Sequence, residues 1–388
     1  MQEFKITNKN KDVILALGGE STGNFSAYKN GKIYFSEDFG DLLDDINYSK
    51  FKSELYKFLK SNKIKPNIIL SDLHPLFHTT ILAQELAKKY KAKYIPVQHH
   101  LAHIFSAIGD QIVERGVCSV KREALGIACD GTGYGYDEKI WGGEAFKIQY
   151  AKYNTQNTRI GHLENQIMIG GEIAIKEPAR LLISILSKFL EKKDAYKYVK
   201  KYYSKNEFEL LWNQLQQNFN CIETSSTARI LDAVSVLLEF SKNESLSKHG
   251  PVDLLEKNST IPYQIKPVVE FNEIEKMWIL KTTPLFKYLI KNLHKDKKRL
   301  AATAQKYIAD GLLEITRRCH PEFISGSREI LKQVQHDNVF FAGGMANNKI
   351  ISSILELKGV YTNKKIPRGD AGLSFGQTFY YLLTNSRD

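Results

Sequence analysis

The pattern of hydrophobic and polar positions near the N-terminus predicts a small antiparallel sheet. Residues 13–17 form a continuous apolar run that ends in two glycines, as a buried strand does. Residues 26–29 and 32–35 flank an Asn-Gly dipeptide, the strongest short-range sign of a β-hairpin. A helical pattern then covers about residues 48–59. The chain therefore opens with three predicted antiparallel strands and a helix.

Two strand–helix units follow. Residues 67–71 predict a buried strand, and about residues 76–89 predict a helix. Tyr94–Val97 predicts another strand, in which Pro96 permits only an edge or strand-end position because it lacks an N–H donor. Three antiparallel strands followed by such units are the layout of an actin-like ATPase lobe.

A second, similar start lies at residues 124–129, a buried strand that leads into Asp130 and a glycine-rich stretch. The repetition predicts an α/β protein with a two-lobed actin-like ATPase (ASKHA) fold and the active site between the lobes. The expected first lobe comprises residues 1–122 and 371–388, and the second comprises residues 123–370 with a helical insertion.

The rest of the chain is mostly helical in pattern. Helices are expected at 179–190, 194–203, 207–219, 227–240 and 349–357, within 284–318, and at the C-terminal end to about 383, with a buried strand at 338–342. Cys319–Asp337 breaks the pattern and resembles a translated repeat element. We expect this segment to be an exposed excursion, because the fold should join its flanks by a few residues.

Composition narrows the possible roles. The 388 residues carry a net charge of +12, but the lysines are spread out, which disfavours a nucleic-acid partner. The four cysteines form no CxxC pair, which predicts a reducing compartment. No apolar run of 18 residues is found, so we expect no membrane association and a cytoplasmic location.

The stretch VQHHLAH, residues 97–103, carries the strongest candidate chemistry. If a helix begins near His99, then His99 and His103 lie one turn apart on the same face. Two imidazoles at this spacing could hold a divalent metal if carboxylates arrive from elsewhere. The alternative is an ordinary strand-to-helix junction with polar residues. His100 and later aspartates favour the metal site.

Glycine-rich segments after predicted strands are candidate nucleotide contacts. A strand ending at Asp130 before Gly131 and Gly133 could bring backbone amides to a phosphate, although such a sequence is more often a hairpin. Gly343 and Gly344 precede another helix and allow close approach of a nucleotide.

Two polar groups later in the chain have alternative interpretations. Asn348 either caps the helix that follows it or contacts a base or ribose. Arg229 and Asp232 are interpreted from spacing alone as a surface pair on one helix.

The motifs together resemble the transferase domain of the HypF-type carbamoyltransferases. That resemblance rests, in order, on VQHHLAH, ACDGTGYG with WGGE, GGEIAIKEPAR, TSSTARILDA, FAGGMANN and IPRGDAGLSFGQ, with DLHP upstream. It covers about Val13–Leu383 apart from the 319–337 segment. The tRNA threonylcarbamoyltransferases of the TsaD type and antibiotic O-carbamoyltransferases are more distantly similar.

The resemblance implies a metal ion, iron or zinc, held by His99, His103, Asp130 and Asp370. It implies that the AMP moiety of carbamoyl adenylate lies against backbone-rich segments, for which the candidates are Gly131, Gly133, Gly170, Gly171, Glu172, Gly343, Gly344 and Asn348. The reaction would transfer the carbamoyl group to a C-terminal cysteine of a HypE-like acceptor during hydrogenase maturation. His100 and Asp130 are the candidate catalytic groups.

The sequence also departs from the family pattern. Thr22 stands where the family usually has Lys, His249 lies where it has Tyr-Glu-Gly, and Ala228 and Ala342 replace Gly and Ser. The acylphosphatase-like, zinc-finger and YrdC-like domains of whole members are not in this sequence, so a separate YrdC-like protein is expected to supply carbamoyl adenylate. A degenerate nucleotide-binding protein or a TsaD-like enzyme are the alternatives.

Overall fold

The computed structural model describes residues 1–8, 10–116, 123–150, 155–245, 250–319 and 338–385. Its first sheet has the strand order β1-β4-β3-β2-β5-β6. The strands are β1 (Gln2–Lys5), β2 (Ile14–Ala16), β3 (Ser26–Lys29), β4 (Lys32–Phe35), β5 (Ile68–Asp72) and β6 (Lys93–Val97). The three predicted antiparallel strands are confirmed, and β6 lies at the edge as Pro96 requires. The sequence did not predict β1, because its mostly exposed residues give no apolar pattern.

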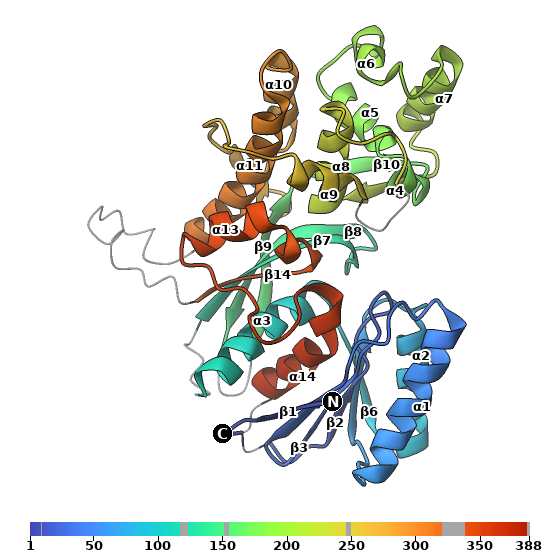
Figure 1. Ribbon diagram of the computed structural model, residues 1–388, viewed down its shortest axis with the longest axis vertical. Helices are drawn as coiled ribbons and strands as arrows, with labels where there is room; N and C mark the ends of the chain where they lie inside the picture. The colour runs from blue at the N-terminus through green and yellow to red at the C-terminus, as the bar shows by residue number, and fades with distance from the viewer. Residues whose placement is uncertain (9, 117–122, 151–154, 246–249, 320–337, 386–388) are drawn as a thin grey trace, which may run out of the picture.

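Helices cover both faces of this sheet. α1 (Asp45–Ser61) and α2 (His78–Tyr90) pack on the outer face, where side chains such as Leu15 and Phe51 are fully buried. α3 (His99–Arg115) and α14 (Leu373–Thr384) pack against each other on the inner face (Figure 1). The helix that the sequence predicts near the C-terminal end, α14, therefore packs on the sheet that the N-terminal residues form.

The second sheet repeats the plan of the first. β7 (Glu123–Tyr134), β8 (Ile140–Gln149) and β9 (Gln156–Leu163) are antiparallel, and β14 (Val339–Ala342) pairs in parallel with β7. The sheet is extended by β10 (Gln166–Ile169), β11 (Cys221–Thr224), β12 (Val269–Asn272) and β13 (Met277–Leu280). The expectation that β7 ends at Asp130 is wrong. The strand runs on to Tyr134 through a register shift, because β8 continues to pair with it.

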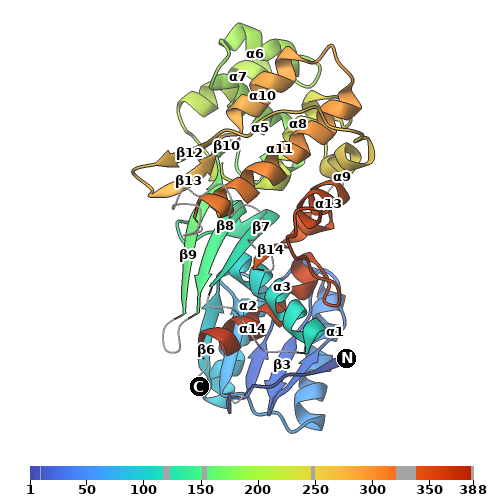
Figure 2. The same ribbon diagram turned by 90° about the vertical axis from the view of Figure 1, so that its left-hand side faces the viewer.

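α3 and α14 lie between the two sheets (Figures 1 and 2). Successive residues of β7 point to opposite faces, so Ala124 and Ala128 pack toward these helices while Leu125 and Ile127 pack into the other core. Gly126 allows close packing, since a Cβ there would lie 2.5 Å from Ile104. The helices thus join the two sheets, and the division at residues 122 and 370 stays a prediction.

The remaining helices pack beyond the second sheet (Figure 1). They are α4 (Ile173–Lys176), α5 (Ala179–Ser187), α6 (Lys192–Val199), α7 (Lys205–Gln216), α8 (Thr227–Leu237), α9 (Gly250–Lys257), α10 (Thr283–Lys291), α11 (Lys297–Arg318) and α13 (Lys349–Glu356). Two 3-10 turns contact each other: η2 (Gly344–Asn347) lies against β7, and η3 (Gly369–Gly372) lies against α3 and α14. Cys319 caps α11, and the rest of the predicted 319–337 excursion lies outside the described residues. No helix in the described part of the chain has both the length and the hydropathy to cross a bilayer.

Candidate metal centre

Two histidines one turn apart on α3 form the core of the site. The helix begins at His99, where the side chain of Gln98 caps it by accepting a hydrogen bond from the N–H of Leu101. This start places His99 and His103 on one face, with their Nε2 atoms 3.0 Å apart. Both side chains are almost fully buried.

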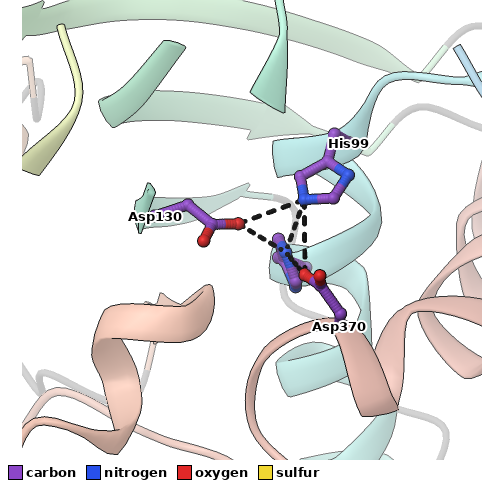
Figure 3. A group of neighbouring side chains, drawn as sticks. His99, Asp130 and Asp370 are labelled. Carbon is purple, nitrogen blue, oxygen red and sulfur yellow. Dashed lines mark hydrogen bonds and ion pairs between the residues drawn. The ribbon is translucent and has the colours of Figure 1, made fainter. Parts of the chain in front are cut away.

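Two aspartates from distant parts of the chain complete the cluster (Figure 3). Asp130 extends from β7, and its Oδ2 lies 3.1 Å from the Nε2 of each histidine. Asp370 lies in η3, and its Oδ1 lies 3.6 Å from His99 Nε2 and 3.4 Å from His103 Nε2. The structure thus brings together all four residues that the sequence proposed as ligands, with one potential ligand atom from each lying within 4.8 Å of the others.

A third carboxylate, which the sequence analysis did not assign, orients His99. Asp72 ends β5 and is buried, and its Oδ2 lies 2.7 Å from His99 Nδ1. Carboxylates in this position fix the histidine tautomer, so that Nε2 presents a lone pair to a metal. The position of Asp72 in the DLHP motif, at the end of a predicted strand, was the sequence feature that could have indicated this role.

The two ligand carboxylates are also held in place. The N–H of Gly131 donates to Asp130 Oδ1 at 2.7 Å, and Ser21 donates a hydrogen bond to Asp370 Oδ2. Ser21 belongs to the turn that follows β2, next to Thr22, and the sequence analysis did not assign it a role. The first sheet therefore supports the site through this turn as well as through Asp72.

The electrostatics show that the cluster favours positive charge. Burial opposes ionisation of Asp130 and Asp370, but the two histidines outweigh it and hold the pKa of each carboxyl below its usual range. Burial also opposes protonation of His99 and His103, yet the surrounding carboxylates raise the pKa of both imidazoles. A cation, either a proton or a metal ion, is therefore stabilised where these atoms converge.

The donor set fits an iron or zinc ion. Bonds of about 2.0–2.2 Å to a common ion place neighbouring ligand atoms roughly 3 to 3.6 Å apart. The two Nε2 atoms lie 3.0 Å apart, and their distances to the nearest carboxylate oxygens of Asp130 and Asp370 are 3.1–3.6 Å. Imidazole and carboxylate ligands suit both metals. His99, His103, Asp130 and Asp370 would hold the ion.

His100 lies behind the cluster rather than in it. Its ring is fully buried and packs against Gly133, where a Cβ would lie 2.3 Å from the imidazole. Burial and the nearby His99 lower the pKa of His100 to about 3. A general-acid or general-base role for His100 stays a prediction, and this environment keeps the ring neutral near pH 7.

The segment of Gly343 and Gly344 lies at the cluster. Gly344 lies beside Asp130, since a Cβ on Gly344 would be 2.9 Å from Asp130 Oδ1. Gly343 has φ +94° and packs on the backbone of Cys129, where a Cβ would lie 2.2 Å from the carbonyl oxygen. A larger residue at Gly343 would therefore disturb the pairing of β14 with β7, whatever it does to a ligand.

Asn348 is engaged as a helix cap. Its Oδ1 accepts from the N–H of Ile351 at 3.0 Å, and its Nδ2 donates to Gln305 Oε1 at 2.8 Å. The side chain is buried, so these two partners occupy it in the described structure.

Gly170, Gly171 and Glu172 form the turn between β10 and α4. Both glycines have positive φ, and Gly170 faces the guanidinium of Arg180. These residues are not members of the four-residue cluster, and their contact with an adenylate stays a prediction.

A second buried network, centred on Glu144 of the WGGE motif, was also missed. Glu144 Oε1 accepts hydrogen bonds from the N–H groups of Gly142 and Gly143 and from Ser225. Its Oε2 accepts from Arg159 at 2.6 Å. Burial would raise the pKa of Glu144, but Arg159 and nearby histidines outweigh this and lower it to about 2. The network ties β8, β9 and the start of α8 together.

The interpretation of Arg229 and Asp232 as a surface pair is wrong. Arg229 Nη1 lies 2.9 Å from Asp232 Oδ2, but only 5% and 2% of the two residues are exposed. α8 is buried along its whole length, because the second sheet, α5 and α9 surround it. Helical spacing identified the pair and could not reveal these neighbours.

The duplicated sheet plan and the His/Asp cluster between the sheets define a protein of the actin-like ATPase-fold class. Family models match the chain at residues 9–110, as "HypF Kae1-like domain", and at residues 126–377, as "Carbamoyltransferase, Kae1-like Domain, second subdomain". The chain belongs to the HypF carbamoyltransferase family.

Individual relatives agree with this assignment. The probable carbamoyltransferase HypF of Methanocaldococcus jannaschii is 32% identical over 397 residues, which cover 99% of this chain and 48% of that protein. The crystal structure of T. kodakarensis HypF matches with a TM-score of 0.80 and 27% identity, over 98% of this chain and 49% of that one.

A full-length HypF in phosphate- and nucleotide-bound form has the same fold, with a TM-score of 0.79 at 24% identity over 98% of this chain and 47% of that one. The chain spans about half the length of these relatives.

Proposed function

We propose that this chain transfers a carbamoyl group from carbamoyl adenylate to a cysteine thiol of an acceptor protein in the maturation of NiFe hydrogenases. The observation that carries the proposal is the convergence of His99, His103, Asp130 and Asp370 between the two sheets, in a chain of the HypF family. A site of this kind suits a reaction in which negative charge develops on a phosphate-bearing substrate.

The chemistry places separate demands on the site. The acceptor sulfur attacks the carbamoyl carbon as a thiolate, a C–S bond forms, and the C–O bond to the phosphate breaks to release AMP. An iron or zinc ion, when bound, supplies Lewis-acid stabilisation of the developing charge. The chain's own residues orient the site: Asp72 fixes the tautomer of His99, and Ser21 and the N–H of Gly131 fix the two carboxylates.

The proposal includes two partners. A YrdC-like protein or domain forms the carbamoyl adenylate, and a HypE-like protein provides the acceptor cysteine. ATP and carbamoyl phosphate alone are then expected to give no transfer.

Mass spectrometry of the acceptor tests the proposal. Metal-loaded protein, carbamoyl adenylate and a HypE-like acceptor should give a carbamoyl adduct on the terminal cysteine, and an acceptor with Ser at that position should give none. If the adduct does not exceed the uncatalysed background, the transferase proposal fails. Binding of AMP without transfer would then favour a non-catalytic nucleotide-binding protein.

A further inference from the structure

Arg229 occupies a position beside the metal centre that the proposed reaction has not yet used. It lies in the first turn of α8, and its Nη2 is 3.1 Å from where a Cβ on Gly131 would be. Gly131 directly follows the ligand Asp130. Ser226, the N-cap of α8, donates to the carbonyl oxygens of Asp130 and Gly131 at 2.9 and 2.8 Å. The helix start, the guanidinium and the ligand-bearing strand are therefore fixed together.

The guanidinium has more donors than the described residues satisfy. Arginine carries five N–H donors, and leaving them unpaired in a buried position is costly. Among the described residues, Arg229 Nε has no hydrogen-bond partner, and Nη1 makes only the ion pair with Asp232 without hydrogen-bond geometry. Asp232 Oδ1 likewise has no hydrogen-bond partner of good geometry, although the backbone of Val252 and the charge of Arg229 both counteract the effect of burial, which raises the pKa of Asp232. The pair is thus incomplete, unlike Arg159, whose Nε donates to Glu144 Oε2 and whose Nη2 lies 2.6 Å from the same oxygen in an ion pair.

Nε and Nη1 are enclosed by the chain, and Nη2 is the donor that lies beside Gly131, so a ligand there would meet the guanidinium through its Nη2 end. A planar guanidinium matches the oxygens of a phosphate or carboxylate in bidentate geometry. The N-terminus of an α-helix adds a favourable field for negative charge, and α8 has 11 residues. An anionic group next to Gly131 would therefore be stabilised both by the guanidinium of Arg229 and by the N-terminus of α8.

We propose that Arg229 binds the phosphate of the adenylate beside the metal centre and that Asp232 positions the guanidinium. This inference rests on the proposed function for the identity of the ligand. The position of Arg229 over Gly131 also explains why a glycine is present there, since a methyl group would contact Nη2.

Calorimetry with AMP and adenosine as probes tests this assignment on the full chain loaded with metal. Wild type should bind AMP more tightly than adenosine. Arg229→Gln should weaken AMP by about 10-fold or more, the effect of a lost charge-assisted hydrogen bond, and leave adenosine unchanged. Arg299→Gln is the matched control, because Arg299 also lies in the first turn of a helix, α11, but its Nε donates to the carbonyl oxygen of Ile261.

Gly131→Ala provides a second variant that keeps the buried charge. Its methyl group should displace the guanidinium and also weaken AMP selectively, and thermal unfolding would verify that both variants fold. Equal AMP affinity in wild type and either folded variant overturns the role of Arg229 while leaving the proposed function intact. Loss of AMP and adenosine in equal measure overturns it as well. Wild type that binds neither probe overturns the nucleotide site itself, and with it this inference.

Discussion

Two of the buried clusters of ionisable side chains among the described residues differ in how far the chain itself satisfies them. Glu144 has partners on both carboxylate oxygens: two backbone N–H groups, Ser225 and Arg159. At the candidate metal centre, His99 and His103 turn nitrogens toward each other and toward the carboxylate of Asp130, all about 3 Å apart. The first cluster is closed, and the second needs a cation that the chain does not provide.

This difference suggests a way to tell a buried charged network that stabilises the fold from one that binds a ligand. A closed network contributes to stability and specifies packing, because every polar group has its partner. An open network lowers stability unless a ligand completes it, so a fold retains it for the ligand. The comparison predicts that variants in the two clusters will affect different measurements.

The largest expected effect is on metal content. In the double variant His99→Ala, His103→Ala, the metal content should fall from close to one iron or zinc per chain to almost none, because both imidazole ligands are lost. Elemental analysis of protein purified alongside the exposed-site control His294→Ala measures this. Equally little metal in wild type and double variant would show that the open cluster is not a metal site.

The closed cluster should instead affect stability. Glu144→Gln keeps the shape but removes the charge, and it should lower the free energy of unfolding by about 3 kcal/mol at pH 7 without changing metal content. Chemical denaturation monitored by circular dichroism measures the loss.

The effect of Glu144→Gln should also depend on pH with a defined sign. Folding lowers the pKa of Glu144 from 4.5 to about 2, so its contribution is complete above about pH 4.5 and disappears as the pH falls toward 2. The difference in free energy of unfolding between wild type and Glu144→Gln should therefore shrink as the pH is lowered over this range. If Glu144→Gln lost metal but kept its stability, the Glu144 cluster would be the functional one, contrary to the comparison.

Asp72→Asn tests the residue that orients a ligand from outside the open cluster. Metal affinity should fall about 10- to 100-fold, because the amide polarises His99 less than the carboxylate does. Competition with a chelator measures the affinity, and Asp194→Asn, whose side chain is half-exposed and pairs with Lys197, serves as the control. Unchanged affinity would mean that His99 is oriented by helix geometry alone.

Asn348→Ala gives the smallest expected effect. Because its amide already has two partners, the change should cost about 1 kcal/mol of stability, as the loss of a helix cap does. AMP affinity should stay within twofold of wild type when titrated by calorimetry. A larger loss of AMP affinity would show that Asn348 contacts the nucleotide. Its two partners in the structure would then not be its only ones when AMP is bound.

Local patterns were sufficient to predict much of the fold. The three opening strands, α3 starting at His99, and the strand before Gly343 follow from periodicity and from the limits that proline and glycine impose. The motif order added what local patterns lack, the association of His99 with Asp370 far along the chain. β1 and the continuation of β7 past Asp130 depend on pairing with neighbouring strands, which no local pattern contains.

The supporting residues of the site were harder to predict for the same reason. Asp72, Ser21 and Glu144 act on partners 27, 349 and 81 positions away in the sequence. Each is an ordinary polar residue until the fold places it beside its partner. Burial of Arg229 and Asp232 likewise depends on the elements around α8, so spacing identified the pair but not its environment.

The position of α14 has a consequence for how the chain matures as it is synthesised. The N–H of Gly18 donates to Gln377, and Ser26 donates to the carbonyl oxygen of Ser374, across 359 and 348 positions. Contacts this distant in sequence form late, because a long loop must close first. Until residues 369–384 have been synthesised, α3 lacks its packing partner on the inner face of the first sheet, and Asp370 cannot join the candidate centre. The four candidate metal ligands can therefore come together only once the chain has been synthesised as far as α14.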